Sequence, residues 1–159
     1  MASSALFRAR LAATLVPAAL LAGAYAFQYV GGLWPCQMCW WQRYAHFAAL
    51  ALALIGWLRP AARGPVVLAG LALAVASLLG LYHAGVEYHW WVGITECTSP
   101  VKFGAGGDPL AAIMAAPTVR CDEVQWKLFG ISMAGYNFLI SGAAAAMVFA
   151  LLAKARKAG

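Results

Sequence analysis

The sequence has very few charged residues, and acidic residues are especially scarce. Only 10% of the 159 residues are charged, and the five Asp and Glu residues all fall between Glu87 and Glu123. In contrast, 64% of the residues are hydrophobic, a share too high for an ordinary soluble domain. This composition excludes most classes of soluble enzyme and binding domain, so the lipid bilayer has to be considered as the solvent of much of the chain.

Two further features are missing. There is no glycine-rich dinucleotide fingerprint, so the sequence gives no sign of a bound nicotinamide cofactor. There are only four cysteines, and Cys36 and Cys39 are the one close pair among them. Structural zinc usually takes its ligands from two close pairs, so this arrangement argues against zinc and we expect no metal.

Four long apolar runs are present instead. Each has about 20 residues, enough for a helix with about 1.5 Å rise per residue to cross a hydrocarbon core about 30 Å thick. We therefore expect an all-α membrane protein, a four-transmembrane-helix bundle that forms one domain over residues 1–159. The expected spans are about 11–30, 40–58, 65–83 and 133–153, with a long outer loop at about 84–132.

Basic residues predict the orientation of these spans. They lie before the first span, in the short second loop and at the end of the chain, and the positive-inside rule makes those segments cytoplasmic. Both termini are then cytoplasmic, and the long loop, which has more acidic than basic residues, lies outside. The net charge of +6 is a topology signal and requires no nucleic-acid partner. The basic residues concerned are Arg8, Arg10, Arg59, Arg63, Lys154, Arg156 and Lys157.

A cleaved signal peptide is an alternative interpretation of the N-terminus. Arg8 and Arg10 precede an apolar run, and Ala22-Gly23-Ala24 or Ala24-Tyr25-Ala26 resembles a cleavage site. The run continues to Val30, which is longer than a usual signal core. Cleavage would also leave only three spans, while the basic residues of the C-terminus would still predict that it is cytoplasmic. We therefore prefer an uncleaved first span.

Tryptophans gather at the predicted outer surface. Indole rings favour the headgroup level, so an interfacial belt is the simpler interpretation. The alternative is that some of these rings wall a pocket for a flat ligand. The six residues are Trp34, Trp40, Trp41, Trp90, Trp91 and Trp126.

The most informative run joins the first two predicted spans. Pro35-Cys36-Gln37-Met38-Cys39 places two cysteines one helical turn apart, and Arg43 follows Cys39 by four residues, on the same helical face. A CxxC pair can close into a readily exchanged disulfide, and a helix start or a nearby cation lowers a thiol pKa. Two thiols and a cation at a membrane surface favour electron transfer between thiols and a molecule dissolved in lipid.

All four cysteines fall on the predicted outer side. An even number of cysteines on the oxidising side of a membrane favours disulfides over free thiols. Cys97 and Cys121 have 23 residues between them, so a bridge between them would close a long loop. Within that loop, Asp108 and Pro109 open a predicted short helix that ends near Met114 and lies on the membrane surface or on the bundle.

Two disulfide pairs on one side of a membrane can pass electrons through mixed disulfides. The loop pair would meet a soluble protein, and the pair at the helix start would meet a quinone in the bilayer. Arg43 would then stabilise a thiolate and negative charge on a quinone oxygen, although a snorkelling interfacial arginine is the alternative. A purely structural role for the disulfides is a rival, but a two-residue CxxC ring stabilises a fold little.

These features resemble the DsbB family, the bacterial inner-membrane disulfide bond formation proteins. The resemblance covers nearly the whole chain: four spans, Pro-Cys-x-x-Cys with an arginine four residues on, and a second cysteine pair in the outer loop. Cys121 through Trp126 and Leu128 through Gly130 look like the family's segment after its last cysteine. The resemblance implies an enzyme of the inner membrane with its cysteines on the periplasmic side.

The resemblance also implies a role for each cysteine. Cys36 and Cys39 match the quinone-proximal pair, and Cys39 matches the cysteine that forms an adduct or charge-transfer species with ubiquinone or menaquinone. Arg43 matches the quinone-site arginine. Cys97 matches the cysteine that forms a mixed disulfide with DsbA, a periplasmic thioredoxin-fold thiol oxidase. Cys121 matches the partner that passes the bridge to the first pair.

The histidines carry weaker signals. His89 lies close to where the family has a histidine near the quinone, so we expect it at the cofactor site. His83 and Glu87 are four residues apart on one helical face and can hydrogen-bond to each other. We expect His46 to be a buried residue paired to a neighbouring helix.

The vitamin K epoxide reductase-like proteins are an alternative family. They also combine a four-helix bundle, a CxxC pair and a quinone. In them the loop cysteines come first in the sequence and the CxxC pair belongs to the last core helix. The order here is the reverse, which favours the DsbB family.

Overall fold

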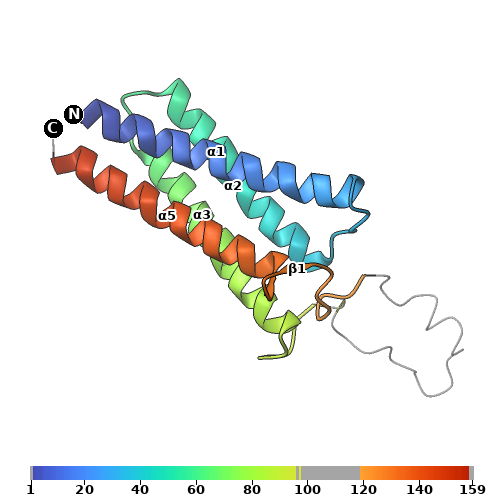
Figure 1. Cartoon of the computed structure of the whole chain (residues 1–159). Coiled ribbons are helices and arrows are strands. Elements are labelled where there is room, and N and C mark those ends of the chain that lie inside the picture. Colours follow the sequence, from blue (N-terminus) through green and yellow to red (C-terminus); the bar gives the residue numbers. More distant parts are fainter. Residues whose placement is uncertain (1, 96, 98–118, 158–159) are drawn as a thin grey trace, which may run out of the picture.

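The computed structural model describes residues 2–95, 97 and 119–157, and in this part of the chain it is a bundle of four helices with one small hairpin (Figure 1). The all-helical expectation is confirmed, while the short helix expected near Asp108–Met114 lies outside the described residues. The elements are α1 (Ala2–Tyr29), α2 (Gln37–Leu58), α3 (Gly64–Glu87), β1 (Lys127–Leu128), β2 (Ile131–Ser132) and α5 (Met133–Lys157).

Three of these helices are long and apolar enough to cross a membrane. They are α1 over Ser4–Tyr29, α3 and α5, judged by length and composition within the described residues. The 22-residue helix α2 packs beside them and carries buried polar side chains, among them Gln42 and His46. The outer faces of the bundle carry exposed apolar side chains, as expected for surfaces that meet lipid tails. Examples are Leu15, Leu71, Val75, Leu78 and Leu139.

Both chain termini lie at the same end of the bundle, next to the α2–α3 connection (Figure 1). Two hydrogen bonds tie these segments together. Arg10 of α1 donates to the carbonyl oxygen of Pro60, and Arg63 donates to the carbonyl oxygen of Ala155 at 3.4 Å. The basic segments identified in the sequence are therefore gathered at one end, and the cysteines lie at the other.

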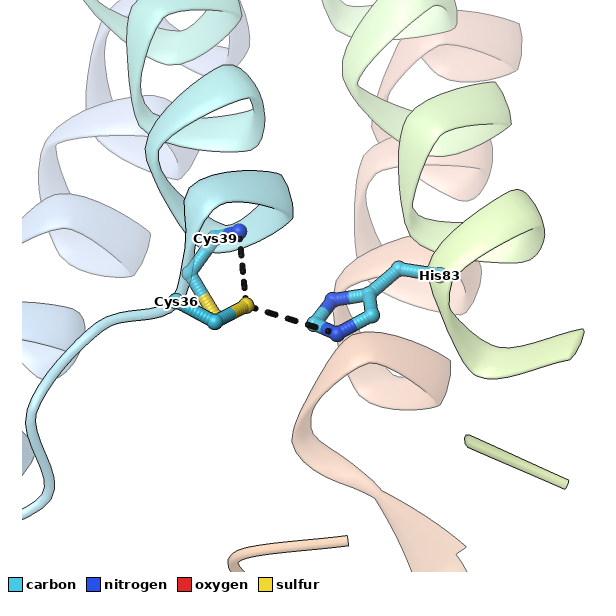
Figure 2. A group of neighbouring side chains, drawn as sticks. All are labelled: Cys36, Cys39 and His83. Atoms are coloured by element: carbon cyan, nitrogen blue, oxygen red, sulfur yellow. Dashed lines mark hydrogen bonds between the residues drawn. The ribbon is translucent and has the colours of Figure 1, made fainter. Parts of the chain in front are cut away.

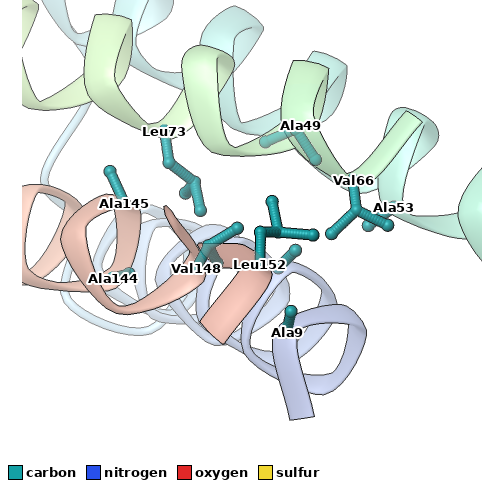
Figure 3. Close-up of a cluster of buried hydrophobic side chains, with 11 residues drawn as sticks. Ala9, Ala49, Ala53, Val66, Leu73, Ala144, Ala145, Val148 and Leu152 are labelled. Atoms are coloured by element: carbon teal, nitrogen blue, oxygen red, sulfur yellow. The ribbon is translucent and has the colours of Figure 1, made fainter. Parts of the chain in front are cut away.

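Small side chains fill the middle of the bundle. The buried core combines Leu73, Val66 and Val148 with alanines from all four described helices (Figure 3). Gly80 of α3 is needed where that helix crosses α5, since a Cβ there would lie 2.8 Å from the backbone nitrogen of Phe138. Backbones this close are typical of membrane helices that associate through small residues.

A two-stranded hairpin, which we did not predict, closes the cysteine end. Phe129 and Gly130 both have positive φ angles, 49° and 80°, as a tight two-residue hairpin turn requires. The Tyr88 hydroxyl at the end of α3 donates to the carbonyl oxygen of Gly130 and accepts from the backbone N–H of Ser132. The hairpin thereby fixes the start of α5 against the end of α3.

Candidate functional site

The thiols of Cys36 and Cys39 meet at the first turn of α2. Cys36 caps the helix, its sulfur accepts the backbone N–H of Cys39 at 3.3 Å, and its S–H donates to the Cys39 sulfur at 3.0 Å. Cys36 is buried, at 3% exposure. The hydrogen bond to Cys39, together with burial, raises the pKa of the Cys36 thiol well above its ordinary value. Cys36 therefore keeps its proton at neutral pH.

The other two cysteines form a disulfide, as their number and location favoured. Cys97 and Cys121 are bonded with their Cα atoms 5.5 Å apart, and both are buried. They belong to one buried cluster that also contains Cys36, Met38 and Val86. The fold thus packs the sequence-distant disulfide against the CxxC pair, the arrangement that exchange between the two pairs requires.

Cys36 and Cys39 also line a cavity of about 300 Å³. This volume falls at the lower end of the usual range for small-molecule sites, roughly 300–1,000 Å³. Its walls are mainly apolar, and Trp34 and Trp126 are among them, so these two rings wall a pocket. The polar lining comes from Gln42, Arg43, His46, His83, Glu87, Arg120, Glu123, Gln125 and Asn137, and the apolar lining includes Leu20, Leu21, Ala24, Phe27, Leu33, Met133, Ala134 and Ile140.

Arg43 reaches from α2 across the cavity wall to α1. Its guanidinium donates to the side-chain oxygen of Gln28 at 2.6 Å and to the carbonyl oxygen of Ala24 at 3.1 Å. It also lies over the rings of Tyr25 and Trp40, 4.7 Å and 5.0 Å from their centroids. Arg43 is only 6% exposed, so its side chain is held inside the bundle.

His83 is the histidine that contacts the thiols (Figure 2). Its Nε2 lies 3.6 Å from the Cys36 sulfur and 3.8 Å from the Oε1 atom of Glu87, and its Nδ1 lies 2.9 Å from the Gln42 amide nitrogen. The expected proximity of His83 and Glu87 is therefore observed. The expected pairing of His46 to a neighbouring helix is also observed, through Asn137 of α5 at 2.7 Å.

His89 lies elsewhere. It is exposed, in the turn after α3, with a φ angle of 59°. It is not among the residues that line the cavity. The structure brings together Cys36, Cys39 and Arg43 of the expected site, packs the loop disulfide beside them, and leaves His89 outside.

Three side chains at the CxxC pair have the donor types of a metal site. The ligand atoms of Cys36, Cys39 and His83 lie within 4.8 Å of one another. However, the Gln42 amide N–H donates to His83 Nδ1, which leaves the proton of a neutral ring on Nε2, the nitrogen that faces the cysteines. A metal ligand needs a free lone pair at that nitrogen. The hydrogen bonds around His83 thus argue against a metal here.

Gln28, Gln42 and Asn137 are functional candidates that we did not predict. Gln28 holds Arg43, and Asn137 joins Gln42 to His46 through bonds of 2.7 Å each. The sequence did contain a sign of these residues, because a polar side chain within an apolar span is energetically costly and usually has a function. The sequence did not reveal their partners, which lie on other helices.

The comparisons with known proteins agree with this geometry. The family model described as "Disulfide bond formation protein DsbB" matches residues 7–151. The chain is similar to curated proteins named "Disulfide bond formation protein B". One from Aromatoleum aromaticum is 35% identical, covering 91% of this chain and 89% of that protein. One from Marinobacter nauticus is 32% identical and covers 77% of each chain. One from Azoarcus is 32% identical and covers 85% of each. No solved structure matches this chain.

Proposed function

Because this chain belongs to the DsbB family of disulfide bond formation proteins, we propose that it re-oxidises a DsbA-like periplasmic thiol oxidase at the expense of a membrane quinone. The enzyme is a protein-disulfide oxidoreductase of the membrane. Its net reaction takes two electrons and two protons from the partner's dithiol and reduces one quinone to a quinol. The observation that carries the proposal is the packing of two cysteine pairs against each other beside a cavity that contains a buried arginine.

We assign the two pairs different tasks. Cys97 exchanges with the soluble partner, and Cys121 passes the bridge to Cys36. Both thiols of the CxxC pair line the cavity with Arg43, but Cys36 is the buried one in the cluster of Cys97 and Cys121, so we assign delivery of the electrons to the less buried Cys39. Thiolate attack on a disulfide sulfur conserves the electron pair at every step, so the two pairs need no further cofactor between them.

The cavity suits the head of ubiquinone or menaquinone. A quinone head is flat and apolar with two carbonyl oxygens, and it needs mainly apolar walls and one or two polar contacts. Arg43 supplies such a contact: each terminal nitrogen that bonds Gln28 or Ala24 carries a second hydrogen. A fixed cation at this point would stabilise both the Cys39 thiolate and the charge that develops on a quinone oxygen.

For the membrane arrangement, we propose four spans with both termini in the cytoplasm and the cysteines in the periplasm. In this proposal α2 is the fourth span, because its 22 residues at about 1.5 Å each cover about 33 Å. Its polar side chains face the bundle, with Gln42, Arg43 and His46 all buried. The basic end of the bundle would then face the cytoplasm, as the positive-inside rule requires.

A visible spectrum of the purified protein with bound quinone, recorded during titration with a reduced thiol partner, tests the proposal. We expect a transient long-wavelength band that disappears in Cys39→Ser, and one quinol formed for each partner disulfide. If no band and no quinone reduction appear while the Cys97–Cys121 disulfide persists, the chain is a disulfide-stapled membrane scaffold.

A further inference from the structure

We propose that His83 is a catalytic residue whose Nε2–H donates a fixed hydrogen bond to the Cys36 sulfur and stabilises the Cys36 thiolate during exchange between the two cysteine pairs. The inference rests on the relay proposed above and assigns it a residue that neither the motif nor the cysteine spacing indicates. Its basis is a chain of hydrogen bonds across α2, α3 and α5 that determines which nitrogen of His83 carries the proton.

Backbone carbonyls fix the orientation of the two amides in this chain. The Gln42 amide nitrogen donates to the carbonyl oxygen of Met38 at 3.2 Å, so its other hydrogen points to His83 Nδ1 at 2.9 Å. The amide nitrogen of Asn137 donates to the carbonyl oxygen of Ala76 at 3.1 Å and to the Gln42 side-chain oxygen at 2.7 Å. A carbonyl oxygen only accepts, so neither amide can be reversed without losing a buried hydrogen bond.

The tautomer of His83 follows from this arrangement. Its Nδ1 has to accept from Gln42, so the single proton of the neutral ring is on Nε2, which lies 3.6 Å from the Cys36 sulfur. A second proton on Nδ1 would point directly at the N–H of Gln42. With 3% exposure, His83 has little access to water that would compensate this contact. In this arrangement the neutral His83 ring is a donor through Nε2–H, and its Nδ1 lone pair is occupied by Gln42.

The Cys36 sulfur thus faces two N–H groups, that of His83 Nε2 at 3.6 Å and that of the Cys39 backbone at 3.3 Å, while the His83 ring also contacts the Cys121 backbone and lies 3.8 Å from Glu87 Oε1. Hydrogen bonds to an anion are stronger than those to a neutral acceptor, so both donors stabilise the thiolate more than the thiol. They are fixed before the reaction, which makes this a preorganised anion site of the kind that lowers a barrier.

The step that benefits is the release of Cys36 from its mixed disulfide with Cys121. The Cys97 thiolate attacks the Cys121 sulfur, the Cys97–Cys121 bond forms, and the Cys36–Cys121 bond breaks. The electron pair of the broken bond remains on Cys36 as a thiolate, and His83 keeps its proton throughout. The geometry suits this step, because His83 Nε2 lies 3.6 Å from the Cys36 sulfur and Cys97 and Cys121 pack in the same buried cluster.

Other charged groups near Cys36 also affect its ionisation, so every variant in the test has to retain them. Arg43 of α2, Glu87 of α3, and Arg120 and Glu123 before the hairpin all line the same cavity. The thiol of Cys39 has the largest direct effect on Cys36, because the two sulfurs share a hydrogen bond. A Cys39→Ser background removes that coupled titration, and keeping the four charged residues in every variant cancels their contribution.

The test measures the ionisation of Cys36 in Cys39→Ser protein with the Cys97–Cys121 disulfide intact, by ultraviolet thiolate absorbance against pH. We expect His83→Ala to lower the ionisation constant of Cys36 by about 10- to 100-fold, the effect of losing a hydrogen bond to a charged group. His83→Gln retains an N–H donor and restores part of the effect. Thr14→Val is the matched control, since it loses a side-chain hydrogen bond with Trp57 far from the thiols and leaves the titration unchanged.

Nitrogen NMR of histidine-labelled protein tests the tautomer without any turnover. The signal that disappears in His83→Ala should show a protonated Nε2 and an unprotonated Nδ1, and Gln42→Glu should move the proton to Nδ1. A protonated Nδ1 in the wild type, or an unchanged Cys36 titration in His83→Ala, overturns the inference.

Failure of the quinone relay is a separate result, visible as absent thiol oxidation in the wild type while this tautomer and titration persist.

Discussion

Arg43 is a buried cation, and within the part of the chain that the structure describes its direct partners are all uncharged. It is held by an amide oxygen, a carbonyl oxygen and two aromatic rings, and none of these groups carries a negative charge. Burying a charge without a counter-ion is costly, so such a residue is retained where a negative charge forms during the reaction. The cavity beside it, lined by the Cys39 thiol, is the place where that charge would develop.

Replacing Arg43 should therefore weaken the use of quinone more than the use of the thiol partner. We expect Arg43→Ala to raise the apparent quinone KM by about 10- to 100-fold, the loss of one or two charge-assisted hydrogen bonds. The measurement is steady-state quinol formation at varied quinone and fixed partner. Arg59→Ala, at the opposite end of α2, is the matched control, and unchanged kinetics in Arg43→Ala would remove Arg43 from the site.

The two thiols of the CxxC pair should react with alkylating reagents very differently. The pKa of Cys36 is raised by its hydrogen bond to Cys39 and by burial, whereas a free cysteine ionises at about 8.5. In the fully folded reduced protein, we expect iodoacetamide to modify Cys39 first at pH 7 to 9, while Cys36 remains a thiol. Peptide mass spectrometry after timed alkylation checks this, and faster modification of Cys36 would contradict it.

The same shift has a consequence for stability. Above about pH 8.5 the unfolded chain loses the Cys36 proton while the folded protein retains it, so the folded state binds more protons. The free energy of unfolding of the reduced protein therefore falls as the pH rises through this range. The contribution of Cys36 to the free energy of unfolding is fully present below about pH 8.5 and is lost as the pH rises above that value.

The sequence located the two cysteine pairs but not the groups around them. Cys36, Cys39 and Arg43 are linked by short spacings on one helix, and such spacings can be read directly. His83 could not be chosen over His89 in this way, because the choice depends on which face of α3 meets α2 at its outer end. Only packing decides that, and it turns His83 inward and leaves His89 in an exposed turn.

At the scale of elements, the helices follow from composition and the hairpin does not. Long apolar runs predict α1, α3 and α5 because each run satisfies its own backbone hydrogen bonds in lipid. The strands β1 and β2 have two residues each, too short to show any alternation of polar and apolar residues. Phe129-Gly130 was their only local signal, and phenylalanine rarely adopts the positive φ angle that it has here.

The close crossing of α3 and α5 depends on Gly80. The sequence shows only that this residue is small. A Cβ at Gly80 would lie 2.8 Å from the backbone nitrogen of Phe138 and 3.0 Å from the carbonyl oxygen of Ala134. Backbone atoms cannot move aside as a flexible side chain can, so we expect Gly80→Ala to destabilise the protein by about 1–3 kcal/mol. Thermal unfolding in detergent micelles measures the difference.

Gly64→Ala is the matched control for this substitution. Gly64 begins the same helix, and a Cβ there would have nothing within 4 Å. Alanine has a higher helix propensity than glycine by up to about 1 kcal/mol, so this variant should be as stable as the wild type or slightly more stable. Equal stability of Gly80→Ala and Gly64→Ala would show that α3 and α5 separate at little cost.

At the scale of the whole molecule, the two ends of the bundle have different chemistry. Arg10 and Arg63 join the termini to the α2–α3 connection at one end, while all four cysteines lie at the other. A thiol relay needs its sulfurs on the oxidising side and its basic anchors on the cytoplasmic side. The polarity of the fold therefore suits a protein that receives electrons on one face and delivers them within the bilayer.

This polarity predicts which positions a membrane-impermeant thiol reagent can reach. In a background with all four native cysteines changed to serine, Phe129→Cys in the β1–β2 turn should be labelled in intact spheroplasts, since Phe129 is 90% exposed at the cysteine end. Arg59→Cys and Lys157→Cys are also exposed but lie at the basic end, so they should be labelled only after the membrane is permeabilised. Labelling of Lys157→Cys in intact spheroplasts would place the C-terminus outside. Labelling of Arg59→Cys without Lys157→Cys would place the α2–α3 connection and the C-terminus on opposite faces of the membrane, which contradicts the hydrogen bond that joins Arg63 to the carbonyl oxygen of Ala155.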